Sequence, residues 1–181
     1  MNLIFRLLYT AIAALMRRRL APLDESVVRF TVLPTDLDLN GHMNNGRYLT
    51  IMDLGRVDLL LRTGVVGAMR RHRWAGVVAS VAVRFRRALN PFQRYELRSR
   101  LIGWDERWFF MEQRFTRRGE LCAYALVKIQ FSGREGRVAP QAMADAVHPG
   151  AESPPVPQAV RDWQNSEERL VAGEEPAPAL A

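Results

Sequence analysis

One long apolar helix that follows a single strand-like segment is the feature that most limits how this chain can fold. From Tyr48 to Leu59, apolar residues recur at the spacing of a helix face, and further leucines widen that surface. A helix with so wide an apolar surface has to be buried, and Gly55 within it would permit close approach to a sheet. Its charged residues fall largely off the apolar face: Asp53, Arg56 and Arg62.

Strand-like segments surround this helix in the sequence. The first, residues 26–33, is rich in β-branched residues and stops before a proline. Four later segments alternate apolar and polar side chains: residues 76–89, 95–104, 107–117 and 121–131. Short connections between the last three predict antiparallel hairpins. A buried helix needs a sheet to enclose it, so the predicted class is α+β, with one curved antiparallel sheet wrapped around the long helix.

We expect three parts along the chain. Residues 1–20 form an N-terminal amphipathic helix, residues 24–135 hold the long helix with its five strands, and residues 136–181 form an acidic extension. Seven of the ten prolines lie in residues 132–181, which leaves little periodicity there. A short helix is expected near residues 159–171.

The N-terminal helix raises the question of membrane contact. Its longest uncharged run, residues 7–16, has ten residues, well short of the roughly twenty that span a bilayer. Apolar residues gather on one side, and three arginines follow at residues 17–19. Two interpretations stay open: residues 1–19 lie on an anionic membrane surface, or they pack on their own domain or on a partner subunit.

The net charge of +7 is unevenly distributed. Residues 140–181 hold seven acidic and two basic residues, and Lys128 is the only lysine of the chain. The arginine bias reflects either a GC-rich genome or attraction to anions such as phospholipid head groups or coenzyme A phosphates. The basic residues are spread over all segments without a recognisable nucleic-acid-binding motif, so no nucleic-acid partner is expected.

The cysteine and histidine content argues against metal chemistry. Cys122 is the only cysteine, which excludes an intramolecular disulfide and a multi-cysteine zinc site. The three histidines lie far apart without metal-ligand spacing, so neither a metal nor another cofactor is expected. We interpret Cys122 as a buried structural thiol and His72, in a basic run, as a surface residue.

A dense polar loop precedes the long helix. Between Asp36 and Asn45 the chain places two carboxylates, one imidazole and three carboxamides within ten residues. Turn formation alone explains Asp, Asn and Gly, but it does not explain a histidine four residues after Asp38. The pattern predicts a small acid/base site at the N-terminus of the helix, in which Asp36 is interpreted as a structural turn or cap acceptor.

The order of strand, loop, helix and four strands resembles the 4-hydroxybenzoyl-CoA thioesterase type of hotdog protein over about residues 26–131. The loop carries that type's Asp-x-Asp-x-x-Gly spacing with a tyrosine seven residues later, and it is also similar to the Asp-x-Asn-x-His motif of plant acyl-ACP thioesterases at Asp38, Asn40 and His42. Together with residues 98–105, it is similar to thioesterase superfamily member six and its bacterial relatives. The resemblance implies the hotdog fold and hydrolysis of acyl-CoA, or acyl-ACP, to acid and thiol.

The resemblance also assigns roles to residues. Asp38 is the expected catalytic residue, either as a general base on water or as a nucleophile that forms a mixed anhydride. Asn40 and His42 are expected to position Asp38, the water or the thioester carbonyl. Further residues are expected to bind substrate, with a backbone N–H near the helix start donating to the carbonyl oxygen: Asn44, Asn45, Gly46 and Tyr48.

The resemblance further implies a homodimer or homotetramer. We expect a cytoplasmic protein, either free or peripheral at the inner membrane, and the apolar residues around the helix favour a fatty or aryl acyl group. Two other functions stay open, a non-catalytic acyl-CoA-binding protein on the membrane and a hotdog dehydratase or hydratase. Two minor alternatives concern charged residues. Asp53 is an exposed charge or an ion-paired residue rather than a catalytic one, and the arginines at 84, 86 and 87 either contact coenzyme A phosphates or form a solvated face.

Overall fold

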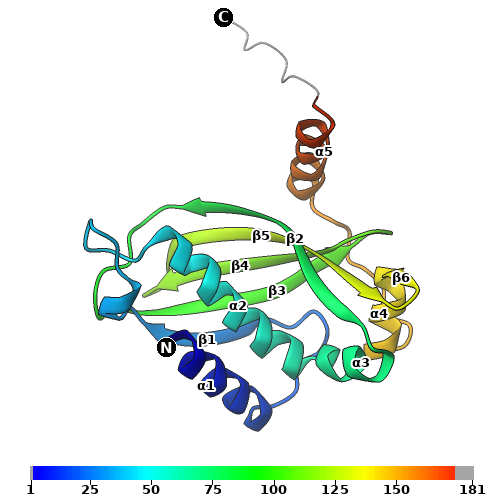
Figure 1. Ribbon diagram of the computed structural model, residues 1–181, viewed down its shortest axis with the longest axis horizontal. Helices are drawn as coiled ribbons and strands as arrows, with labels where there is room; N and C mark the ends of the chain where they lie inside the picture. The colour runs from blue at the N-terminus through cyan, green and yellow to red at the C-terminus, as the bar shows by residue number, and fades with distance from the viewer. Residues whose placement is uncertain (1, 174–181) are drawn as a thin grey trace, which may run out of the picture.

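An antiparallel sheet curves around helix α2 in the computed structural model, which describes residues 2–173 (Figure 1). The strand order is β1-β3-β4-β5-β2, and β6 extends the sheet by pairing with β5. The strands are β1 Ser26–Thr31, β2 Ala75–Phe85, β3 Arg94–Trp104, β4 Phe109–Arg117, β5 Glu120–Gly133 and β6 Gly136–Val138. The helices are α1 Asn2–Met16, η1 Pro34–Asp36, α2 Asn45–Arg62, α3 Val65–His72, α4 Pro140–Val147 and α5 Gln158–Ala172.

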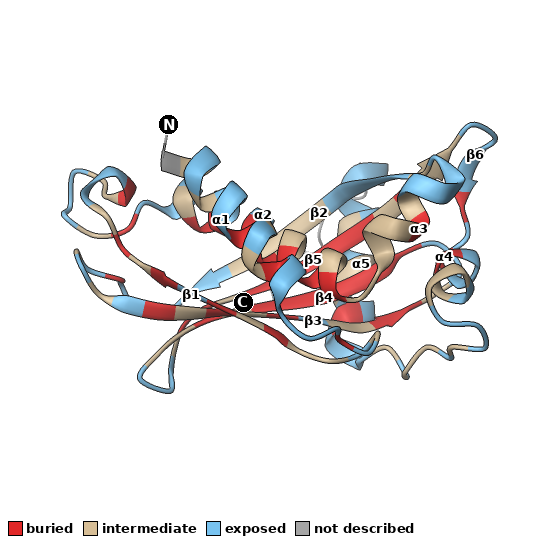
Figure 2. Ribbon diagram, turned by 90° about the horizontal axis from the view of Figure 1, so that it is seen from below, coloured by how far each residue is buried: buried red, intermediate tan, exposed pale blue. Residues whose placement is uncertain are grey.

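This arrangement is the hotdog fold, so the predicted fold class is confirmed. Buried positions are frequent along the central strands β4 and β5, as Figure 2 shows in red. Strand β4 pairs antiparallel with β3 and with β5, so the hairpins predicted from the short connections are present. Two predicted segments were too long, because the β2 strand ends at Phe85 and the N-terminal helix at Met16.

Gly55 lets α2 lie directly on the sheet. An added Cβ at this position would lie 2.6 Å from Leu97 Cδ2 and 2.7 Å from Ser99 Oγ, both on β3. Such distances are shorter than van der Waals contact, so only glycine fits without displacing these two side chains. The close approach suggested by the sequence is therefore present.

Two arginines of α2, Arg56 and Arg62, are less exposed than their place in the sequence pattern suggested. Arg62 is buried, because its guanidinium donates to Asp58 at 3.1 Å and to the Arg18 carbonyl at 3.1 Å. Arg56 donates to the buried Gln113 side chain at 2.9 Å. The expectation that these arginines lie off the buried face was wrong, since the apolar pattern does not reveal buried partners on other elements.

The C-terminal extension adds structure that the sequence pattern only hinted at. Helix α5 covers the outer face of the sheet, where Val160 packs against Trp108 and Phe110. Helices α3 and α4 had no clear signal in the sequence. Across residues 2–173, each helix is too short or too polar to cross a lipid bilayer.

We predict that Gly55→Ala destabilises the fold by about 1–3 kcal/mol, because the added methyl group overpacks the contact between α2 and β3. Chemical denaturation measures the change. Gly67→Ala in α3 is the control, since its Cβ would meet only the Arg71 side chain at 3.5 Å. Equal stability of Gly55→Ala and the control would contradict this account of the packing.

Candidate active site

Backbone hydrogen bonds within the loop between η1 and α2 set the conformation of this loop. Leu37 and Met43 form an isolated antiparallel bridge, and the Asp38 N–H donates to the His42 carbonyl at 2.9 Å. The Gly41 N–H donates to the Asp38 carbonyl at 3.1 Å, with Gly41 in the left-handed region at φ 76°. This tight turn places the side chains of Asp38 and His42 next to each other.

Asp38 and His42 form the pair that the sequence motif predicted to lie together. Oδ2 of Asp38 lies 3.4 Å from Nδ1 of His42, while Oδ1 accepts the backbone N–H of Asn40 at 2.9 Å. The Asp38 side chain is 21% exposed and the His42 side chain 36%, so both are partly accessible to solvent. The carboxylate is thereby oriented and remains partly exposed to solvent.

Asn40 joins this pair through its backbone rather than its side chain. Its N–H orients Asp38, while the residue itself is exposed. The structure thus brings Asp38, Asn40 and His42 into one turn, and the chemical roles expected for them stay predictions.

The helix start adjoins the same turn. Asn44 is the N-cap of α2, and its Oδ1 accepts the Gly46 N–H at 2.8 Å. Within residues 2–173, the Asn45 N–H at the first helical position donates to no acceptor. Unsatisfied N–H groups of a first helical turn point outward and attract negative charge. Asn44, Asn45 and Gly46 are exposed, so this donor is accessible.

Asp36 braces the loop from below, as its structural interpretation predicted. The carboxylate is 1% exposed, lies 2.8 Å from the Arg6 guanidinium of α1 and 3.2 Å from Arg47 Nε, and accepts the Leu33 N–H at 2.9 Å. The Asp36 carbonyl accepts the Asn44 N–H at 2.9 Å. Sequence reasoning missed Arg6 and Arg47, and an arginine thirty residues away carries no local signal of such a contact.

Tyr48 sits in the core beneath the loop. Its ring packs 5.1 Å from Phe85 and 4.9 Å from Phe115, measured between centroids, and burial raises its pKa to about 12. The phenol therefore stays protonated at neutral pH. The single chain shows Tyr48 as a packing residue, and its expected contact with substrate stays a prediction.

Three other residues behave as their simpler interpretations predicted. Asp53 forms an ion pair with Arg56 on the surface of α2. The His72 ring stacks on Trp74 with centroids 4.4 Å apart. Cys122 is buried, and burial raises the pKa of its thiol, so at neutral pH it is not a reactive thiolate. Among residues 2–173, no group of three His, Cys, Asp or Glu side chains is placed to hold a metal ion.

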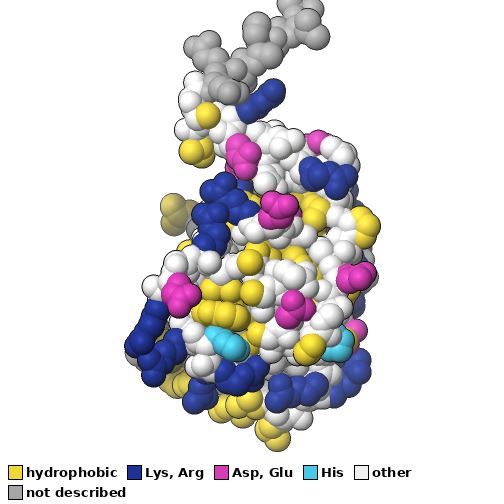
Figure 3. All heavy atoms as spheres, turned by 90° about the vertical axis from the view of Figure 1, so that its right-hand side faces the viewer, with side chains coloured by type: hydrophobic (Ala, Val, Ile, Leu, Met, Phe, Trp, Pro, Cys, Tyr) yellow, Lys and Arg dark blue, Asp and Glu magenta, His cyan; other side chains and the backbone are white. Residues whose placement is uncertain are grey.

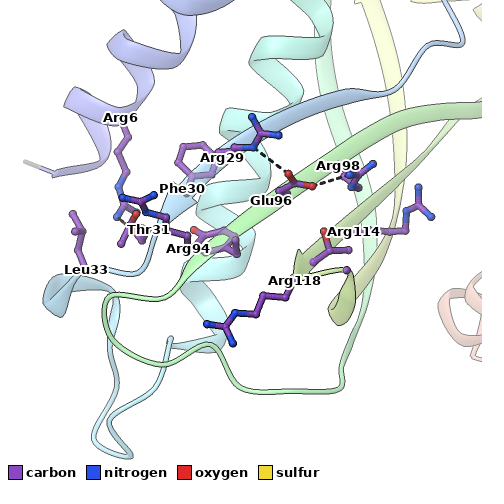
Figure 4. A pocket seen from close by; sticks show the side chains of 13 residues that line it. Arg6, Arg29, Phe30, Thr31, Leu33, Arg94, Glu96, Arg98, Arg114 and Arg118 are labelled. Atoms are coloured by element: carbon purple, nitrogen blue, oxygen red, sulfur yellow. Dashed lines mark hydrogen bonds and ion pairs between the residues drawn. The ribbon is translucent and has the colours of Figure 1, made fainter.

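Two hollows lie near the loop. A small one of about 230 Å³ adjoins the helix start and is lined in part by Asn44, Gly46 and Arg47. A larger groove of about 970 Å³ runs beside β1 and is rich in arginine (Figure 4). Glutamates neutralise much of its charge, as where Arg29 and Arg98 both pair with Glu96. The smaller hollow is the one that touches predicted substrate-binding residues.

Comparison with known proteins finds relatives in a thioesterase-like family. Residues 32–164 match the family described as the thioesterase-like superfamily. Protein THEM6 of Xenopus laevis is 42% identical over 85 residues, which are 47% of this chain and 41% of that protein. A probable thioesterase of Saccharomyces cerevisiae is 32% identical over 98 residues, 52% of this chain and 43% of that protein. The chain thus spans less than half the length of these relatives.

Solved structures share the fold. The probable thioesterase YbaW from Escherichia coli aligns with a TM-score of 0.62 at 22% identity, covering 67% of this chain and 97% of that one. The relatives named above that match by sequence are eukaryotic, so the expected link to bacterial relatives of THEM6 is not confirmed. The family match extends from the end of β1 into α5, well over half of the sequence, and the chain therefore belongs to the thioesterase-like superfamily.

Proposed function

We propose that this protein hydrolyses acyl thioesters, with Asp38 as the general base or the nucleophile. The observation that carries the proposal is the Asp38–His42 pair, with 3.4 Å between Oδ2 and Nδ1, in an ordered turn at the start of α2. Family membership supports the reaction class, and the geometry supports the choice of residue.

Either route uses the partly exposed carboxylate of Asp38. As a base, the carboxylate takes a proton from water while the water oxygen attacks the thioester carbon, and the C–S bond then breaks to release the thiol. As a nucleophile, the carboxylate attacks that carbon itself, releases the thiol and leaves a mixed anhydride that water hydrolyses. Both routes end in a free acid and a thiol.

The start of α2 would stabilise the charge that develops on the carbonyl oxygen. The exposed Asn45 N–H, beside the positive end of the helix dipole, is a donor placed for such an oxyanion. We assign Asn40 and His42 to positioning Asp38 or the attacking water. Asn44 and Gly46 line the adjoining hollow and are assigned to substrate contact.

We propose acyl-CoA as the substrate, with acyl-ACP as the other carrier that fits. Phe85 at the end of β2 packs against Tyr48 of α2, which brings the two arginines that flank Phe85 close to the start of α2. Arg84 and Arg86 are exposed and make no ion pair within residues 2–173, so they are free to meet the phosphates of a carrier. Both carriers are cytoplasmic, and we place the activity there.

A second copy of the chain would complete the site. Strand β2 is an edge strand of eleven residues that pairs only with β5 among the described strands, and it exposes Val77 and Phe85 by 56% and 42%. A long apolar edge of this kind invites pairing with another strand. The hollow at α2 is also smaller than a typical pocket of at least about 300 Å³. We therefore propose a homodimer formed edge to edge through β2, and a homotetramer would join two such dimers.

We predict that Asp38→Asn lowers kcat/KM for acyl-CoA hydrolysis by about two or more orders of magnitude, because the carboxamide neither accepts the proton nor attacks the carbon. Thiol release from a panel of short-chain, long-chain and aryl acyl-CoA substrates measures the change. The buried Cys122 does not interfere with such an assay while the protein stays folded.

Asp162→Asn, an exposed carboxylate on α5, is the matched control and should retain the wild-type rate. A comparable loss in Asp53→Asn with full activity in Asp38→Asn would move the catalytic carboxylate onto α2. Tight binding of acyl-CoA without thiol release in the wild type would instead support a non-catalytic acyl-CoA-binding protein. Turnover of a 3-hydroxyacyl or enoyl thioester without thiol release would indicate a dehydratase or hydratase.

We predict that Val77→Lys weakens the dimer by at least about tenfold, because it places a charge on the exposed apolar edge that the proposed contact would bury. Analytical ultracentrifugation over a range of concentrations measures the dissociation constant. Val171→Lys on α5, at a residue 89% exposed, is the control and should leave the mass unchanged. A monomeric wild type would exclude the dimer proposal.

A further inference from the structure

Helix α1 packs on the domain with its polar side inward. Thr10 and Ala14 are buried against the domain, and Arg6 points at the loop beneath α2, as Figure 4 shows. An ordinary surface helix buries its apolar side and turns its polar side to solvent. The reversed orientation requires an explanation, because it leaves the apolar side of α1 in water.

Two buried carboxylates hold the helix in this orientation. Arg6 lies 2.8 Å from Asp36, and Arg17, just after the helix, lies 3.2 Å from Asp58. Both carboxylates are 1% exposed, and removing one partner from a buried charge costs free energy. Arg17 also donates to the Val27 carbonyl of β1 at 3.0 Å. Rotating α1 to bury its apolar side would break these contacts at both ends.

The outward side of α1 is an unbroken apolar stripe. Figure 2 shows exposed positions on the side of α1 turned away from the sheet, and each side chain of the stripe is more than half exposed. In Figure 3, hydrophobic side chains protrude along the lower edge of the molecule, where Figure 1 places α1, close to basic side chains. The stripe consists of Ile4, Phe5, Leu8, Tyr9, Ile12, Leu15 and Met16. Exposed apolar patches of this extent mark contact with a partner or a membrane.

The charges around the stripe favour an anionic bilayer as that partner. Residues 1–23 contain four arginines and no acidic residue. Arg18 and Arg19 follow the helix, are exposed, and form no ion pair within the part of the chain that the structure describes. A second copy of α1 would bring no negative charge to these two arginines, whereas anionic head groups would supply phosphates. At about 1.5 Å per residue, the fifteen residues of α1 suit a helix that lies in the plane of the interface.

We infer that α1 docks this protein on an anionic lipid bilayer, with the apolar stripe in the boundary between head groups and acyl chains and with Arg18 and Arg19 on lipid phosphates. The docked helix is joined to the catalytic loop, because Arg6 pairs with Asp36 two residues before Asp38. The bilayer therefore holds the thioester site at a set position above its surface. Docking itself does not depend on the hydrolysis proposed above, whereas the placement of a thioester site near the membrane rests on it.

Sedimentation with vesicles tests the inference on the full chain. The wild type should bind vesicles of phosphatidylcholine with about 30% phosphatidylglycerol at least about tenfold more tightly than vesicles of phosphatidylcholine alone. Leu8→Ser/Ile12→Ser should weaken binding to the anionic vesicles by at least about tenfold, because two apolar side chains no longer insert. Arg18→Gln/Arg19→Gln should remove most of the preference for phosphatidylglycerol.

Leu170→Ser/Val171→Ser is the matched control, since it removes two exposed apolar side chains from α5 and should leave vesicle binding unchanged. Hydrolysis of a short-chain acyl-CoA in solution should be the same in Leu8→Ser/Ile12→Ser and wild type, which separates docking from catalysis. Failure of the wild type to bind anionic vesicles would overturn the inference. A smaller oligomer in Leu8→Ser/Ile12→Ser, with no vesicle binding in the wild type, would assign the stripe to a second copy instead.

Discussion

The buried carboxylate of Asp36 is the interaction that holds together the loop carrying the proposed site. It joins three elements, because it lies against Arg6 of α1 and Arg47 of α2 and accepts the Leu33 N–H beyond β1. A buried carboxylate is stable only when such partners surround it. Its backbone carbonyl also holds Asn44, so the turn that carries Asp38 is anchored on both sides. The contact therefore links the loop that carries Asp38 to helix α1.

The other fixed contact lies where α2 crosses the sheet. Gly55 permits the backbone of α2 to approach β3, and the buried Gln113 side chain donates to the Met52 carbonyl and to Ser99 at 3.0 and 2.9 Å. Because α2 is held so closely, its N-terminus has a defined position relative to the loop. An oxyanion donor has to be preorganised in this way to stabilise a transition state.

Local patterns were enough for the architecture and for the proximity of Asp38 and His42. Alternating strands around one apolar helix predicted the sheet that encloses α2, and Asp-x-Asn-x-His placed Asp38 and His42 within one turn. Local patterns failed where the decisive partner is distant in sequence. Arg62 was expected off the buried face, yet it is buried, because Asp58 and the Arg18 carbonyl receive its charge. The same limit hid the contact between Arg6 and Asp36.

The sequence by itself determined the order of elements, the dense polar loop and the two sides of the N-terminal helix, because each depends on residues close together in the chain. Only the tertiary structure decided which side of α1 faces inward. A hydrophobic pattern alone predicts that the apolar side packs on the domain. The structure reverses it, because the buried carboxylates Asp36 and Asp58 require Arg6 and Arg17 as partners and leave the apolar stripe in solvent.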